Sequence, residues 1–280
     1  MLRIVTDGAA DIPEEWIKEF EIDVCPINIH FGKETFLQGV DLDNEGFYQL
    51  VEETKKIPKT SQPNPQQFAN FYKKIALPGD TILSIHVTSK LSGTYNSAVA
   101  AAREVADLFK VLTFDSLTGS MGLGFMCRQA RIMERAGLSL EMILAKLENI
   151  RDTVRIVLAL DTLEYARMCG RVSTMQAAMA SLLNVKPIAV VRNGQVFMTE
   201  KVRTRKASIQ RLIQIVKEEM ANLPLMVAVL HARAPKEGKE LLELASVELN
   251  VKEIILHDLS ISLAANFGPG TLGIVVVPLE

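Results

Sequence analysis

The sequence predicts an α/β protein of two domains: an N-terminal, mainly parallel α/β sandwich and a C-terminal α+β domain with a mixed sheet. Apolar, β-branched runs alternate with helical spacings up to about Asp152, which indicates parallel crossovers. Beyond that point Asn193-Gly194 joins two apolar runs, a strong hairpin signal. A length of 280 residues and a hydrophobic content of 48% suffice for two cores. We place the domains at residues 1–155 and 156–280.

In the N-terminal half, short apolar runs predict strands and capping residues predict helix starts. Asp11 and Pro13 are expected to open the first helix, and Asp43 to cap the next. Gly32-Lys33 marks a hairpin, and three prolines predict an irregular Ile57–Pro65. A helix is expected to start at Thr94. The predicted strands are Leu2–Thr6, Val24–Phe31, Glu34–Leu37, Thr81–Val87 and Lys110–Phe114.

In the C-terminal half, hairpin and crossover patterns are mixed. Lys186–Arg192 and Gln195–Lys201 flank the Asn-Gly turn, and Ser173–Leu183 is an apolar helical pattern. Further strands are predicted at Val154–Leu160, Leu225–Leu230, Glu253–Leu256 and Leu272–Val277, and helices at Lys206–Ala221 and Pro235–Glu248.

Composition argues against several functional classes. A net charge of −2 does not indicate a nucleic-acid-binding surface. Three widely spaced cysteines indicate free thiols in a reducing compartment. Asp7 interrupts the apolar core that a signal peptide needs, and no apolar run reaches the about 18 residues of a membrane span. We expect a soluble, cytoplasmic protein.

The sequence shows no local signature of a metal or nucleotide site. The four histidines lack zinc-binding spacing, and neither CxxC nor GxxxxGK[ST] occurs. We interpret Gly119–Gly124 as close packing at the start of a helix. A Ser-His-Asp triad assembled from distant segments stays open, because triads are defined by geometry.

One loop has the character of an anion site. The apolar run Thr81–Val87 ends in the hydroxyl-rich segment Thr88–Thr94, and an alanine-rich helix follows at once. The first N–H groups of a helix have no internal partner and favour negative charge. Ser92 and Thr94 add hydroxyls, and Gly93 permits close approach to the backbone. The alternative is an ordinary helix cap.

Four segments together carry a family resemblance: Thr6–Pro13 (TDGAADIP), Thr60–Pro65 (TSQPNP), Leu91–Ala98 (LSGTYNSA) and Gly268–Gly273 (GPGTLG). In this order and at these separations they resemble the DegV family of bacterial fatty-acid-binding proteins. The resemblance covers essentially the whole chain. It implies one long-chain fatty acid held between the two domains, with its carboxylate at the interdomain cleft and its tail in an apolar tunnel.

The resemblance also implies a carrier without catalytic residues, metal or cofactor. Proteins similar to this one present the fatty acid to a separate fatty acid kinase, and the acyl phosphate then enters phospholipid synthesis. The expected ligand-binding residues, which match family motif positions, are Thr60, Ser61, Ser92, Gly93, Thr94, Arg171, Asn266 and Gly268. Apolar residues of the helix expected at Ser173–Leu183 could line the tunnel, namely Met175, Met179, Leu182 and Leu183.

The chain departs from the family pattern at two positions. Gly8 stands where the family usually has serine. Asn266 stands where the family usually has a histidine that is thought to lie near the carboxylate. Asparagine keeps donor and acceptor capacity but cannot carry charge or shuttle a proton. We expect Asn266 to donate its amide N–H to the fatty acid.

Two other functions remain open from the residues alone. The same anion loops could hold a small phosphorylated or carboxylated metabolite in an enzyme, with Asp7 or Asp115 as a base at a strand end. The basic segment Arg203–Lys206 could instead serve an interaction module, for example by docking a kinase.

Overall fold

A computed structural model describes residues 1–173 and 185–279. The chain forms two compact units, Met1–Asp152 and Thr153–Glu280, each with its own central sheet. The helix expected over Ser173–Leu183, with the proposed tunnel positions Met175, Met179, Leu182 and Leu183, falls outside the described residues except for Ser173.

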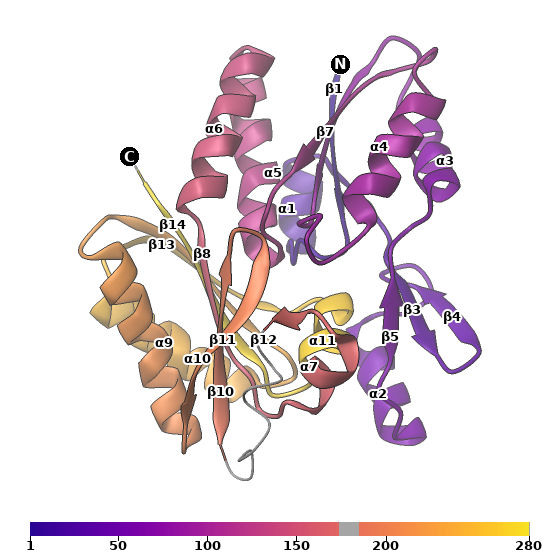
Figure 1. The fold of residues 1–280 in the computed structure, drawn as a ribbon. Helices are drawn as coiled ribbons and strands as arrows, with labels where there is room; N and C mark the ends of the chain where they lie inside the picture. The colour runs from indigo at the N-terminus through magenta and orange to yellow at the C-terminus, as the bar shows by residue number, and fades with distance from the viewer. Residues whose placement is uncertain (174–184, 280) are drawn as a thin grey trace. The chain divides into compact units, whose positions relative to one another are not determined.

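The first unit is built on a four-stranded sheet in the order β2-β1-β6-β7 (Figure 1). All of its pairings are parallel, which confirms the prediction for this half of the chain. Its strands are β1 (Leu2–Asp7), β2 (Ile22–Cys25), β6 (Thr81–His86) and β7 (Lys110–Asp115).

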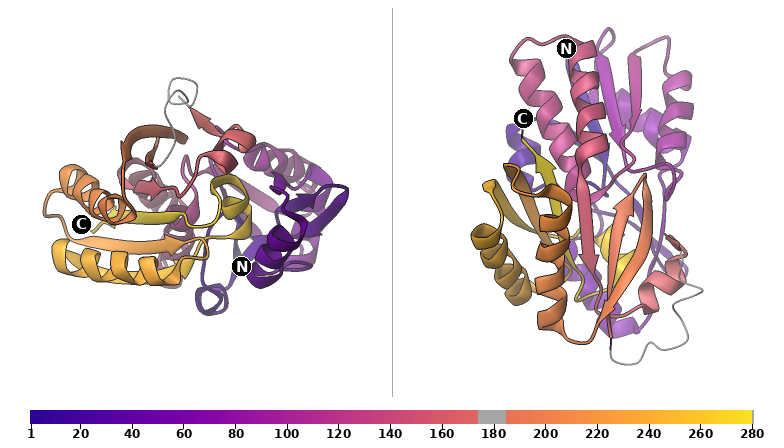
Figure 2. Two further views of the ribbon diagram at one scale, coloured as in Figure 1. Left: turned by 90° about the horizontal axis from the view of Figure 1, so that it is seen from below. Right: turned by 60° about the vertical axis from the view of Figure 1, so that its left-hand side comes forward.

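Helices cover both faces of this sheet, with α3 and α4 on one side and α1, α5 and α6 on the other (Figures 1 and 2). Val5 and Ile82 point to the first side and pack with Phe68, Tyr72 and Ala98. The bounds are α1 (Glu14–Glu19), α3 (Pro65–Ile75), α4 (Thr94–Glu104), α5 (Ser120–Arg135) and α6 (Leu140–Thr153). Because side chains alternate along a strand, residues two apart on β6 share a face.

A second, antiparallel sheet of order β4-β3-β5 accompanies α2 (Asn44–Thr54). Its strands are β3 (Asn28–Phe31), β4 (Glu34–Leu37) and β5 (Lys59–Ser61). The single strand predicted at Val24–Phe31 was wrong: it is split between two sheets around Pro26, which has no N–H for a ladder. Ile57–Pro65 was also wrongly predicted to be wholly irregular, because Lys59–Ser61 pairs with β3.

Two helix starts show how the loops of this unit are fixed. The Asn64 side chain accepts from Gln67 N–H, and the Gln67 side chain accepts from Asn64 N–H, a capping box at α3. The predicted Asp11 cap is wrong: α1 begins after Pro13 without a side-chain cap. Asp11 instead has φ +50° and accepts from Ser120 Oγ at 2.6 Å.

The second unit contains a mixed seven-stranded sheet of order β13-β12-β14-β8-β10-β11-β9. The predicted Asn-Gly hairpin is confirmed by the antiparallel pairing of β10 with β11. The strands are β8 (Arg155–Ala159), β9 (Val172–Ser173), β10 (Lys186–Arg192), β11 (Gln195–Val202), β12 (Leu225–His231), β13 (Val251–Asp258) and β14 (Leu272–Pro278).

Figure 1 shows α9 (Arg205–Met220) and α10 (Pro235–Glu248) on one side of this sheet, and α7 (Glu164–Cys169) and α11 (Ile261–Phe267) on the other. The core under α9 is aliphatic, and it includes Leu212, Val229 and Ile274 at 0% exposure. On the other side α7 packs against α11, and the ends of these two helices carry the expected site residues of this unit.

Candidate ligand-binding site

Three loops meet at the carboxyl edge of the parallel sheet, because β1, β6 and β7 point the same way. Thr88 N–H donates to Thr118 O at 2.8 Å, which ties the β6–α4 loop to the β7–α5 loop. Ser120 N–H donates to Ala9 O at 2.7 Å, which ties the β7–α5 loop to the β1–α1 loop. The carboxyl edge of a parallel sheet is where α/β proteins usually bind ligands.

The glycine-rich segment after β7 serves close packing, which confirms its sequence interpretation. A Cβ on Gly124 would lie 2.9 Å from Ala10 O and 3.1 Å from Ile12 Cγ1. A larger side chain would therefore push α5 away from the β1–α1 loop.

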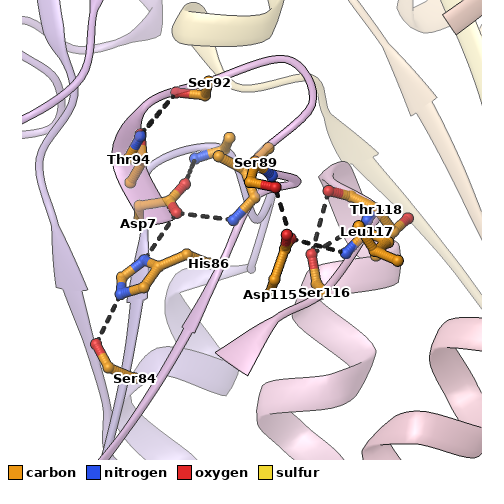
Figure 3. A network of polar contacts seen from close by, with 12 residues as sticks. Asp7, Ser84, His86, Ser89, Ser92, Thr94, Asp115, Ser116, Leu117 and Thr118 are labelled. Carbon is orange, nitrogen blue, oxygen red and sulfur yellow. Dashed lines mark hydrogen bonds and ion pairs between the residues drawn. The ribbon is translucent and has the colours of Figure 1, made fainter. Parts of the chain in front are cut away.

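Asp7, the last residue of β1, is a fully buried acceptor that organises this edge (Figure 3). Its Oδ2 accepts from Val87 N–H and pairs with His86 Nδ1, both at 3.0 Å. Its Oδ1 accepts from Ala9 N–H at 3.0 Å. One carboxylate thus fixes the ends of two neighbouring strands.

A chain of hydrogen bonds continues from His86 through Ser84 to Tyr72 on α3. His86 Nε2 lies 2.7 Å from Ser84 Oγ, and Ser84 Oγ lies 2.8 Å from the Tyr72 hydroxyl. Burial raises the pKa of Tyr72, so its hydroxyl keeps its proton and can donate. One arrangement of donors and acceptors then satisfies every group in the chain. The Tyr72 hydroxyl donates to Ser84, the Ser84 hydroxyl donates to His86 Nε2, and His86 Nδ1–H donates to Asp7.

This Asp7–His86–Ser84 order resembles a catalytic triad in connectivity only. All three side chains have 0% exposure, so Ser84 Oγ cannot meet a substrate. The ring of His86 also packs edge-on against Phe68 of α3, at 5.0 Å between centroids. The network is therefore structural: it positions the loops above it.

The carboxylate of Asp115 likewise accepts hydrogen bonds from backbone N–H groups. Its Oδ1 accepts from Ser89 N–H at 3.1 Å and from Leu117 N–H at 3.2 Å (Figure 3). Together with Asp7, it therefore serves the loops as an acceptor. Neither aspartate is arranged as a catalytic base.

The start of α4 presents donors that the described residues do not use. Ser92 Oγ accepts from Thr94 N–H at 3.3 Å and lies 2.8 Å from Thr94 Oγ1. Ser97 N–H is the first to bond back into the helix, to Gly93 O. Within the described chain, the N–H groups of Gly93, Tyr95 and Asn96 have no partner. Such a group of N–H donors, with two hydroxyls beside it, can bind a carboxylate or phosphate oxygen.

Thr60 and Ser61 lie on β5, and Ser61 lies beside two side chains that sequence reasoning missed. Ser61 Oγ lies 2.8 Å from His30 Nε2 and 3.4 Å from Asn28 Nδ2, which donates to it. His30 Nδ1 lies 2.9 Å from Thr35 Oγ1. The spacing of Asn28 and His30, two apart on one strand, was the available signal, because it places both side chains on one face of the sheet.

The β5–α3 loop meets the start of α4 through Gln62. A Cβ on Gly93 would lie 2.7 Å from Gln62 Nε2 and 3.0 Å from Gln62 Cδ. The loop itself is held by Asn28, whose Nδ2 donates to Gln62 O at 3.1 Å. The structure therefore brings the TSQPNP and LSGT motifs together within the first unit.

Arg171, Asn266 and Gly268 lie in the second unit. Arg171 follows Gly170, the residue with φ +68° that caps the C-terminal end of α7. Its Nη1 donates to Cys169 O at 2.6 Å, and its N–H donates to Cys169 Sγ at 3.5 Å. Burial raises the pKa of the Cys169 thiol, so this contact is with a neutral sulfur.

Asn266 and Gly268 stand at the end of α11. Asn266 Nδ2 donates one N–H to Ser262 O at 2.7 Å, which leaves its second N–H. Gly268 N–H is already donated to Ala264 O at 2.8 Å. Gly268 has φ +86°, and a Cβ there would lie 2.8 Å from Tyr165 Cδ2. Gly268 is therefore required for the shape of the loop, and its own N–H is used within α11.

The departure at Gly8 has a physical reason. Gln38 Nε2 donates to Gly8 O at 2.7 Å, and a Cβ on Gly8 would lie 2.8 Å from Gln38 Cδ. The glutamine amide therefore occupies the space that a serine side chain would need.

The described part of the chain contains no group of three or more His, Cys, Asp or Glu side chains arranged to hold a metal ion. None of its helices combines the length and the apolar character that crossing a bilayer requires. Its cysteines Cys25, Cys127 and Cys169 are free thiols.

The family described as "Uncharacterised protein, DegV family" matches residues 1–279. The chain belongs to the DegV family. Protein DegV of Bacillus subtilis is 33% identical over 275 residues, which are 98% of each chain. The resemblance inferred from the motifs is therefore confirmed.

Solved structures of DegV proteins share the fold. A family protein from Thermus thermophilus, described for its fatty acid binding, has a TM-score of 0.90 at 28% identity, over 99% of both chains. DegV of Bacillus subtilis, described as a fatty acid binding protein, has a TM-score of 0.87 at 33% identity, again over 99% of both. These similarities confirm the predicted fold class.

Proposed function

We propose that this protein is a carrier that binds one long-chain fatty acid and catalyses no reaction itself. Membership of the DegV family supports the proposal, as do the structural relatives described as fatty-acid-binding proteins. The observation in this chain that carries it is the start of α4, where the N–H groups of Gly93, Tyr95 and Asn96, which have no partner among the described residues, adjoin two hydroxyls.

In this proposal the fatty acid carboxylate binds at the start of α4. The N–H groups donate to its oxygens together with one of the two hydroxyls of Ser92 and Thr94, since the other hydroxyl hydrogen is used in the bond between them. Such charge-assisted bonds are stronger than neutral ones. Thr60 and Ser61 supply further hydroxyls from β5. Within the described residues, Thr60 Oγ1 has no partner that would compete.

Three residues of the second unit take their proposed roles from the family motifs. Arg171 donates from a planar guanidinium fork to a carboxylate or phosphate. Asn266 offers its second amide N–H. Gly268 contributes the turn that holds Asn266 in place, since its own N–H is used.

The acyl tail supplies most of the affinity. Each buried CH₂ contributes about 0.8 kcal/mol, so a sixteen-carbon chain gains on the order of 10 kcal/mol before the costs of association. The polar groups then set orientation more than affinity. This division explains how a few donors suffice for a ligand with one charged end.

We propose that a separate fatty acid kinase phosphorylates the bound carboxylate and that the guanidinium of Arg171 pairs with the new phosphate. The acyl phosphate would then serve phospholipid synthesis. The protein would work in the reducing cytoplasm, which its free thiols fit. An enzyme that uses Asp7 or Asp115 as a base is disfavoured, because both carboxylates accept backbone N–H groups.

Mass spectrometry tests the proposal directly. Lipid is extracted from the purified protein, and the native mass of the intact protein is measured beside it. One equivalent of long-chain fatty acid per chain is the expected result. Protein that is empty and also fails to take up added hexadecanoic or octadecenoic acid would overturn the proposal.

A further inference from the structure

Gln62 is a polar side chain at the proposed carboxylate site with no assigned role. Its backbone is fixed by Asn28, whose Nδ2 donates to Gln62 O at 3.1 Å. The Asn64–Gln67 capping box fixes the chain immediately after it. The loop therefore holds Gln62 in one place without using its carboxamide.

The carboxamide of Gln62 lies against the start of α4. A Cβ on Gly93 would meet Gln62 Nε2 at 2.7 Å and Oε1 at 3.5 Å, so the donor end of the amide is the nearer one. Gly93 has φ −77° and ψ +3°, a conformation open to any residue. The backbone angles do not require glycine here, and the close approach of the Gln62 carboxamide is the contact that a side chain at this position would displace.

The amide has no partner of its own. Within the described part of the chain, neither Nε2 nor Oε1 of Gln62 makes a hydrogen bond, and the side chain is exposed. The neighbouring N–H groups of Gly93 and Tyr95 are also unpaired. Unpaired donors that come from two separate loops therefore converge on one small volume.

We propose that Gln62 contacts the bound carboxylate, donating from Nε2, and that it helps the site to prefer a carboxylate over a neutral head group. This inference rests on the proposed fatty-acid binding. A neutral donor suits the position, because it strengthens an anion site without adding a fixed charge. A hydrogen bond to a charged group is stronger than one to a neutral group, so the contribution appears only with the ionised ligand.

The test compares two ligands with the same tail, hexadecanoic acid and hexadecan-1-ol, on four variants of the full chain. Gln62→Met keeps the volume of the side chain and removes the donor. Gln62→Glu keeps the shape and adds a repelling charge. Gln66→Met and Gln66→Glu are matched controls, because Gln66 points to Asn70 (3.1 Å) and to Glu104 (3.4 Å), the last residue of α4.

Dissociation constants are measured by displacement of a fluorescent fatty acid. Gln62→Met is expected to weaken acid binding about tenfold, the effect of losing one charge-assisted hydrogen bond. Gln62→Glu is expected to weaken it further. Both should leave alcohol binding within about twofold of wild type, as should the Gln66 variants for either ligand.

Three results would overturn the inference. Acid binding that is unchanged in both Gln62 variants removes Gln62 from the site. Equal losses for acid and alcohol show a merely structural role. Wild-type protein that binds neither ligand overturns the proposed function as well, which separates that failure from a failure confined to Gln62.

Discussion

The buried carboxylate of Asp7 allows a sharp prediction. Its two oxygens accept from three N–H groups, those of Ala9, Val87 and the His86 ring. Asp7→Asn replaces one acceptor oxygen with an NH₂ group. If the amide oxygen faces Val87, the NH₂ meets the Ala9 N–H; in the opposite orientation, the NH₂ meets the Val87 N–H.

The imidazole can adapt to this change, but the backbone cannot. A switch of tautomer lets His86 Nδ1 accept from the new NH₂, with Ser84 and Tyr72 reversing their order of donation. One buried backbone N–H is still left without a partner in either orientation. Together with the lost charge, we expect the free energy of unfolding to fall by about 2–4 kcal/mol.

Asp115→Asn is the matched control. Only Oδ1 of Asp115 accepts within the described residues, from Ser89 and Leu117 N–H groups, so an asparagine oxygen can keep both bonds. We expect a cost below about 1 kcal/mol. Urea unfolding of both variants is followed by circular dichroism, and hydrogen exchange of the Ala9 and Val87 amides reports the local effect. Equal costs for the two variants, or unchanged exchange at both amides in Asp7→Asn, would refute the reasoning.

Four further predictions follow from single contacts. Gly8→Ser should lower the free energy of unfolding by about 1 kcal/mol, because the serine side chain breaks the Gln38–Gly8 hydrogen bond. In a Gln38→Ala background, the same Gly8→Ser change should cost nothing when unfolding is measured. Gly268→Ala should lower the free energy of urea unfolding by about 1–3 kcal/mol, because Gly268 has a positive φ. An unchanged free energy of unfolding would contradict this loop geometry. Asn266→His should bind fatty acid more tightly at pH 6 than at pH 8, since imidazolium pairs with carboxylate; unchanged affinity and unchanged kinase-dependent phosphorylation would exclude Asn266 from the site. Burial raises the pKa of the Cys127 thiol from 9.0 to about 12, so the unfolded chain ionises first as the pH rises. The stability that the buried neutral thiol contributes is therefore complete below pH 9 and is lost as the pH rises towards 12. The stability difference between wild type and Cys127→Ala should therefore shrink over that range, and a constant difference would refute it.

Local pattern predicted much of the fold and of the candidate site. The start of α4 at Thr94 and the β10–β11 hairpin follow from signals within a few residues, because capping and tight turns are local events. Motif spacing predicted the family, whereas the roles of Thr60 and Ser61 stay a prediction. Local pattern failed at Val24–Phe31, where one apolar run serves two sheets, and at Asp11, whose partner Ser120 lies 109 residues away.

The sequence by itself determined most of the long strands and helices and the hydroxyl-rich loops, since periodicity and turn chemistry act within short windows; the short elements β5, α7 and α11 were not predicted from it. Only the tertiary structure decided which side chains meet. His86 reaches Asp7 across 79 residues because β1 and β6 are neighbours in a parallel sheet with one register. Gln62 reaches Gly93 because β5 pairs with β3 and aims the following loop at α4. Strand order and register are properties of the whole unit, and no window of sequence contains them.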